Sequence, residues 1–284
     1  MRHVLALGLV LSSTPALADY TEVAPVRPLT LSDPAGLSSI SLEFQLTRWT
    51  QPQVPPLPDL DFQNLTFDLA ADITLAKHWV LLGRMPITKT GIEDTDCCDL
   101  AIGNLTVGGR GLWSSVGATG RTVAGFEFSL SLPTASDEDE GLVSTTGAAL
   151  ARLPHDPGRY LPNTTTLRIM PLIQYYTPRF LIQGEAGLDL FLYDNDGGDG
   201  SDTGVRVAVA FGVRATYTVA ILAEINSLFI LDDTAGDDDV SSLDIGVRYA
   251  SGKGLFGVRF YFPIDDSLRD LDMFGIGLDG GLRF

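Results

Sequence analysis

The chain has 284 residues, of which 36 are acidic and 19 are basic, so its formal net charge is −17 and its pI is about 4.3. This charge argues against nucleic acid and against anionic lipid surfaces as partners. The only two cysteines, Cys97 and Cys98, are adjacent, which excludes a framework of loop-spanning disulfides.

The first 18 residues have the three parts of a secretory signal peptide. Arg2 supplies the positive start, residues 4–11 the apolar segment, and residues 16–18 a small-residue cleavage site. The apolar segment is too short to cross a bilayer as a helix, which takes roughly 20 residues. We therefore expect a signal peptide over 1–18, a periplasmic N-terminal extension over 19–37 and one strand-forming region over 38–284.

From residue 38 onward, apolar and polar residues alternate in runs that predict β-strands. In the first run, Leu42 and Phe44 alternate with Ser41 and Glu43. About twelve such runs are expected, over 38–48, 65–75, 80–88, 100–113, 121–132, 164–176, 180–193, 204–216, 219–231, 240–250, 255–263 and 273–284. Runs of roughly 9 to 13 residues suit tilted strands that cross a bilayer.

The connections between these runs alternate in length. Short turns fall near Lys77, Ser115, Pro178, Tyr217 and Gly252, and longer loops at 49–64, 89–99, 133–162, 194–203, 232–239 and 265–270. This alternation predicts an all-β, up-and-down antiparallel transmembrane β-barrel with both termini in the periplasm. The longest loop, 133–162, is expected to fold over or into the barrel mouth as a gate or plug. The alternative is a soluble secreted sandwich or barrel with its apolar face as core.

The final run resembles the closing strand of bacterial outer-membrane β-barrels. Phe284 and Leu282 lie on one face of it, and Arg283 and Gly281 lie on the other. The resemblance implies a place in the outer membrane of a Gram-negative cell and contact with its lipid and lipopolysaccharide. It also implies that the barrel-assembly machinery reads Phe284 as an assembly signal. Aromatic residues near run ends, expected at the membrane interfaces, are Trp49, Trp79, Trp113, Tyr175 and Tyr176.

Charged residues gather on the face expected to line the lumen, and nearly all the cations there are arginines, which suit fixed pairing with carboxylates. They allow two interpretations: a salt-bridged lumen that stabilises a narrow barrel, or a charged constriction in a pore. If the pore conducts, replacing Arg206 or Arg214 with alanine should change its ion preference. The predicted lumen-lining residues are Glu43, Asp68, Asp72, Glu127, Arg168, Glu185, Asp189, Arg206, Arg214, Glu224, Asp244, Arg248 and Arg259.

Several expected outer loops are strongly acidic. The best candidate for a cation site is the loop 194–202, where Asp194, Asp196 and Asp199 only loosely match the spacing of a calcium-binding loop. A solvated acidic loop is the simpler interpretation, and no cofactor or metal is expected. Divalent cations that bridge these loops to lipopolysaccharide phosphates are a weaker alternative.

The residues expected in a hydrolase are mostly missing. Two histidines follow the signal peptide, His78 in a short turn and His155 in the longest loop beside Asp156. A serine–histidine pair on neighbouring strands is not visible, so an enzyme is not expected. A hydrolytic site around His155 stays as the least favoured alternative.

Two stretches resemble an outer-membrane family named after the MetA pathway of phenol degradation. They are residues 98–103, with Asp99 before an apolar strand start, and residues 125–135, where Leu132, Pro133 and Thr134 match a strand-ending Leu-Pro-Thr-Gly. Ala135 replaces the glycine of that pattern. The resemblance implies a passive channel or facilitator for small, often aromatic solutes. A non-conducting structural or adhesion barrel with functional acidic loops is the alternative.

Overall fold

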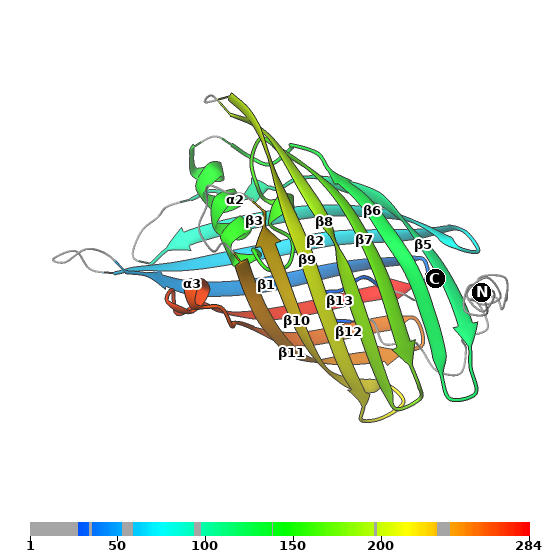
Figure 1. The fold of residues 1–284 in the computed structure, drawn as a ribbon. Coiled ribbons are helices and arrows are strands. Elements are labelled where there is room, and N and C mark those ends of the chain that lie inside the picture. The colour runs from blue at the N-terminus through cyan, green and yellow to red at the C-terminus, as the bar shows by residue number, and fades with distance from the viewer. Residues whose placement is uncertain are drawn as a thin grey trace.

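The computed structural model describes residues 28–33, 36–52, 59–93, 98–137, 139–195, 198–231 and 239–284. Over this part of the chain, twelve spanning strands form a closed antiparallel barrel in up-and-down order (Figure 1). The barrel closes because the first strand pairs with both the second and the last. The strands are β1 (Ser39–Gln51), β2 (Leu60–Ala76), β3 (Trp79–Ile92), β4 (Ala101–Ile102) continued by β5 (Thr106–Val116), β6 (Arg121–Ser131), β7 (Thr164–Tyr176), β8 (Phe180–Asn195), β9 (Gly198–Arg214), β10 (Val219–Ile230), β11 (Asp239–Ser251), β12 (Gly254–Pro263) and β13 (Phe274–Arg283).

Each strand directs its polar side chains inward and its apolar side chains outward. On β7, Gln174 is buried at 1 % exposure, whereas Ile173 beside it is 57 % exposed. The same contrast holds around the wall, with buried arginines and carboxylates inside and exposed leucines, valines and phenylalanines outside. A soluble barrel needs the opposite arrangement, so that alternative is wrong, and the outer face is the surface that a lipid bilayer covers.

Two strand predictions need correction. The fourth run is not continuous, because Gly103 to Leu105 leave the sheet between β4 and β5: Asn104 turns inward and its backbone N–H bonds Arg159. The predicted loop 194–203 is largely strand, since β9 begins at Gly198 and pairs with β8 as far as Asn195. The acidic residues here extend a hairpin instead of forming a free loop.

The two ends of the barrel differ. Short turns at Lys77, at 117–120, at 177–179, at 215–218 and at Gly252 join the strands at one end, where the C-terminus also lies (Figure 1). The other end carries α2 (Asp139–Ala151), η2 (Pro157–Arg159) and α3 (Asp266–Arg269). None of the described helices is long and apolar enough to cross a membrane. Which end faces the periplasm stays a prediction.

The expected interfacial aromatics separate into two groups. Trp79 and Trp113 meet edge to face with ring centroids 6.2 Å apart and, together with Phe126, form a cluster near the short-turn end. Trp49 is instead buried inside the opposite mouth, where it stacks on Phe62, so its assignment to an interface was wrong. Side chains alternate between the two faces of a strand, and Trp49 lies six residues after Glu43 on β1. It therefore points into the lumen, as Glu43 does.

The predicted signal peptide and Cys97 lie outside the described residues. Cys98 is described, is disulfide-bonded and has a positive φ of 82°. Cys97 is the only other cysteine in the chain.

Candidate functional site: a lumen filled from both ends

The predicted lumen residues lie on the inner face of the barrel. Most of them line one internal cavity: Glu43, Asp68, Glu127, Arg168, Glu185, Arg206, Arg248 and Arg259. Asp72, Asp189, Glu224 and Asp244 are buried beside it at 3 % exposure or less. Arg214 is half-buried at the end of β9 and does not line the cavity. Of the two arginines chosen to test a charged constriction, Arg206 lines the cavity and Arg214 lies at the end of the strand.

Residues 28–33, here called the N-terminal segment, lie inside the barrel. The backbone N–H of Leu29 and of Thr30 donates to the carboxylate of Glu224, and the Thr30 hydroxyl donates to it as well at 2.6 Å. Leu29 and Leu31 fill small apolar notches in the wall. This part of the range 19–37 was expected outside the barrel, and that expectation was wrong for it. The cause is clearest at the buried carboxylate of Glu224, whose donors among the described contacts are Leu29 and Thr30 of the segment.

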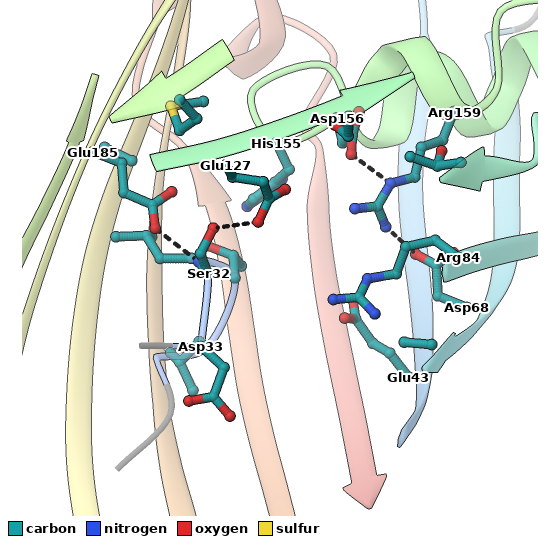
Figure 2. A pocket seen from close by; sticks show the side chains of 18 of the residues that line it. Ser32, Asp33, Glu43, Asp68, Arg84, Glu127, His155, Asp156, Arg159 and Glu185 are labelled. Atoms are coloured by element: carbon teal, nitrogen blue, oxygen red, sulfur yellow. Dashed lines mark hydrogen bonds and ion pairs between the residues drawn. The ribbon is translucent and has the colours of Figure 1, made fainter. Parts of the chain in front are cut away.

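The N-terminal segment continues across the lumen by the same kind of contact. The Ser32 backbone N–H donates to Glu185 at 2.8 Å, and its hydroxyl donates to Glu127 at 3.1 Å (Figure 2). Asp33 pairs with Arg283 at 3.1 Å. Arg110 donates to the Asp33 carbonyl at 2.7 Å. The segment thus bridges carboxylates and arginines on distant strands.

Residues 132–163, of which 138 is not described, are here called the inward loop because they enter the lumen from the other end. Arg152 reaches Glu43 at 2.6 Å and Asp68 at 3.2 Å, and it donates to Gln45 at 2.7 Å. His155 bonds Asp244 through Nε2 at 2.7 Å. The expectation that this loop folds into the mouth is confirmed by these contacts.

The second half of the inward loop joins a chain of ion pairs. Asp156 lies 2.9 Å from Arg168 and 2.5 Å from Arg159, and Arg159 reaches Asp68 at 3.3 Å (Figure 2). On the wall, Asp189 pairs with both Arg168, at 2.6 Å, and Arg206, at 2.9 Å. Such a chain holds its members in fixed positions because charge-assisted hydrogen bonds between arginine and carboxylate are strong and directional.

Asn104, in the break between β4 and β5, anchors the inward loop to the wall. Its side-chain amide donates to the carbonyls of Gly158, Leu161 and Thr164 at 2.8 to 3.2 Å. Its side-chain oxygen accepts from the backbone N–H of Thr134 at 2.9 Å and of Ala135 at 2.8 Å. Asn104 is fully buried. One side chain therefore fixes both the beginning and the end of the loop.

The charges of the inward loop have shifted pKa values with clear causes. Burial lowers the pKa of His155, and Arg259 and Arg152 lower it further against the attraction of Asp244. Burial alone would raise the pKa of Asp156, but Arg159 and Arg168 outweigh it and hold it well below its usual range. The docked loop therefore favours a neutral His155 and an ionised Asp156.

The space left between the two segments is small. The cavity has a volume of about 110 Å³ and is lined by residues of both segments, among them Ser32, Arg152 and Asp156. Pockets that hold small ligands usually measure roughly 300 to 1,000 Å³. This cavity is therefore too small for a ligand of that size.

The cation and hydrolase alternatives gain no support from the described residues. Within the part of the chain that the structure describes, no three His, Cys, Asp or Glu side chains are grouped so as to hold a metal ion. Asp194 and Asp199 oppose each other across the β8–β9 hairpin, and Asp196 lies outside the described residues. His155 bonds a carboxylate and packs at a tilt against the Tyr261 ring, but among the described contacts it meets no serine or cysteine.

Sequence reasoning missed the residues that hold the two segments. Thr30, Ser32 and Asn104 are ordinary polar residues, and nothing in the local sequence marks them. Arg152, Asp156 and Arg159 carried a weak signal, because they bring alternating charges into a stretch of apolar and small residues.

Comparisons with known proteins bear on the fold. No family model matches the chain, and no curated protein matches it. Among solved structures, it resembles the COG4313 outer membrane channel from Pseudomonas putida F1, with 12% identity and a TM-score of 0.59 over 96% of this chain and 100% of that one. It also resembles the translocator domain of the autotransporter NalP from Neisseria meningitidis (9% identity, TM-score 0.48, 100% and 94% covered) and the NanC porin (6%, 0.49, 86% and 98%). Similarity at this level of identity shows the barrel fold alone.

Proposed function

We propose that this protein is an outer-membrane channel for small solutes that is closed at rest by the N-terminal segment and the inward loop. The observation that carries the proposal is the way in which the lumen is filled. Neither segment is a strand of the barrel, so either can leave without breaking a hydrogen bond of the β-ladder. A lumen that opens this way exposes a charged wall to water, as in barrels that conduct.

Two resemblances support the same function. The stretches at 98–103 and 125–135 resemble a family of proposed transporters from phenol degradation, and the P. putida protein is described as a channel. We infer from them a solute that is small and often aromatic. We also propose periplasmic termini and an assembly role for Phe284, whose side chain is 65 % exposed on the apolar outer face. Replacing Phe284 with serine should then reduce the amount of folded barrel in the outer membrane.

The proposal is tested by recording single channels of the refolded protein in planar bilayers, after folding has been checked by heat-shifted mobility on a gel. The wild type should show long closed periods. Replacing residues 28–33 with Gly and Ser, combined with Arg152→Ala, should give frequent, discrete openings. Arg269→Ala is a matched control, because Arg269 pairs with Asp266 on an exposed helix, where a salt bridge contributes little.

The second candidate is a non-conducting structural or adhesion barrel. It is favoured by the small cavity and by the number of lumen charges that are already paired. If the variant with residues 28–33 replaced and Arg152→Ala folds but shows no channel openings, this candidate is supported and the channel proposal is overturned. Uptake of an uncharged aromatic solute into liposomes that contain this variant must also be absent, because ionic current does not detect the passage of uncharged solutes.

We propose no enzymatic role. A barrel hydrolase centred on His155 would have to use a side chain that is 5 % exposed and bonded to Asp244. His155→Ala in the folded protein should leave ester and peptide turnover at background.

A further inference from the structure

We propose that the outer wall over β1, β2, β3 and β13 carries a binding site for a phosphorylated glycolipid of the surrounding outer leaflet. A groove of about 500 Å³ lies there, on the membrane-facing side of the strands and near the end that carries the long loops. Its lining includes Arg48, Gln63, Lys89, Gly91 and Phe274, and we call it the outer groove. The side chains of Arg48, Gln63, Lys89 and Phe274 point away from the barrel axis, whereas Trp49 and Phe62, which also line the groove, belong to the inner face of the strands.

The outer groove is where the outer face of the barrel is basic. Among the described strands, only two outward-facing positions are basic, Arg48 and Lys89, and both are exposed and line this groove. Neither has a carboxylate oxygen within 4 Å among the described residues, in contrast to most arginines of the lumen. Arg48 makes only a long contact to Gln63 at 3.5 Å. Two such cations beside a lipid-covered wall suit an anionic headgroup.

The strand register arranges the groove in layers. Thr50 is level with Asp61, and the next outward pair along these strands toward the short-turn end is Arg48 with Gln63. One further step brings Leu46 level with Leu65, and Leu65 level with Lys89. Beyond them the outward positions are apolar, with Phe44 level with Phe67. Carboxylates thus come first, then cations, then a hydrophobic surface.

This order matches the parts of a phosphorylated glycolipid. Its phosphates would meet Arg48 and Lys89, and its acyl chains would continue over the apolar positions beneath them. Asp61, Glu93 and Asp272 line the groove on the loop side, where Mg²⁺ can bridge carboxylates to phosphates. A membrane phospholipid has one phosphate and no sugar, so it would use less of the groove. The site also explains how a chain of net charge −17 can hold an anionic lipid: the cations are concentrated at one place.

Gly91 gives the groove its depth. It lies level with Gln63, and a Cβ atom added there would meet nothing closer than the Gln63 carbonyl oxygen at 4.0 Å. Gly91→Leu should therefore fold normally and fill the groove, which separates the shape of the site from its charge.

The test is native mass spectrometry of the full-length mature protein in detergent with Mg²⁺, titrated with diphosphorylated lipid A. We expect the wild type to retain lipid A, and the Arg48→Gln/Lys89→Gln double variant to bind it about tenfold more weakly or worse. Gly91→Leu should weaken binding by a similar factor. The matched control is Lys77→Gln/Lys253→Gln, which removes two exposed cations at the short-turn end and should bind as the wild type does.

Several results would overturn the proposal. Unchanged affinity in both the double variant and Gly91→Leu, with each barrel folded by gel mobility, would show that the groove is not the site. Equal binding of lipid A without its phosphates would show that the cations do not recognise the ligand. Equal binding of phosphatidylglycerol would assign the groove to anionic lipids in general rather than to a glycolipid.

Discussion

The N-terminal segment and the inward loop occupy the same lumen, but they bind its wall with different groups. The N-terminal segment mostly offers backbone N–H groups and hydroxyls to wall carboxylates, as Thr30 does to Glu224 and Ser32 to Glu185. The inward loop mostly offers charged side chains, as Arg152 does to Glu43 and Asp156 to Arg168. The wall is thus complementary to neutral donors in one part and to ions of both signs in the other.

This difference has a consequence for how each segment can leave. Departure of the inward loop separates ion pairs, which costs less when water and salt solvate the released charges. Departure of the N-terminal segment removes the donors of Glu224, and among the described contacts the ion pair that it separates is Asp33 with Arg283. We therefore expect salt and acid to act mainly on the inward loop.

The largest effect is expected from Arg152→Ala. Breaking a buried ion pair by removing one partner typically costs about 3–5 kcal/mol, and Arg152 is 5 % exposed. Because Glu43 keeps Arg259 and Asp68 keeps Arg159, we expect about 3 kcal/mol of loop docking to be lost. The open probability in bilayer recordings should rise by up to about a hundredfold. An open probability equal to that of Arg269→Ala would show that Arg152 does not hold the loop.

Asn104→Ala should have the next largest effect. It removes the partner of five backbone groups at the two ends of the inward loop, and a buried group without a partner costs about 1–3 kcal/mol. Hydrogen exchange of the amides of 134–135, 158–161 and 163–164 should quicken, while that of the barrel strands should not. Thr146→Ala, at an exposed position of α2, is the control. Uniform quickening over the whole barrel would mean that Asn104 stabilises the wall rather than the loop.

Thr30→Val should weaken only the N-terminal segment. The substitution keeps the shape of the side chain and removes the hydroxyl that donates to Glu224, while the two backbone donors remain. A hydrogen bond to a charged group contributes about 1.5–3 kcal/mol, and we expect the lower value. Amides of 29–33 should exchange faster than in Thr119→Val, whose hydroxyl is exposed in a turn. Faster exchange in the inward loop instead would contradict the independence of the two segments.

The smallest effect is expected from pH. Because the pKa of His155 is lowered when the loop is docked, protonation favours the undocked loop. Docking is fully stable above the ordinary His pKa of roughly 6.5 and weakens as the pH falls through that value towards the lowered pKa. The groups that face His155 are Asp244, Arg259 and Arg152, with the Tyr261 ring beside it.

Channel activity should therefore rise between about pH 7 and pH 5 in the wild type. His155→Gln keeps a donor for Asp244 and cannot titrate, so it should show a flat response over the same range. A wild type that closes on acidification would reverse the sign and refute the assignment. The lowered pKa of Asp156 acts in the same direction, but only below its ordinary range.

Much of the wall could be predicted from the sequence. The run 164–176 coincides with β7, and most other strands begin or end within a few residues of their expected limits. Such agreement is possible because, in a strand with one apolar face, the alternation of apolar and polar residues shows which face each residue occupies. The failures occur at Asn104, where the alternation is interrupted, at Trp49, where the alternation continues and carries an aromatic side chain inward, and at Asp199, where acidic residues mimic a loop.

The sequence by itself determined that the chain forms a barrel, which residues face the lumen, and which long loop enters it, because all of these follow from local alternation and loop length. Only the tertiary structure decided that residues 28–33 return into the lumen, since Thr30 and Glu224 are 194 residues apart. It also decided that Asn104 anchors the loop and that Arg48 and Lys89 share one groove. Contacts of this kind depend on which strands lie near one another once the barrel has closed. The local alternation of apolar and polar residues does not contain that information.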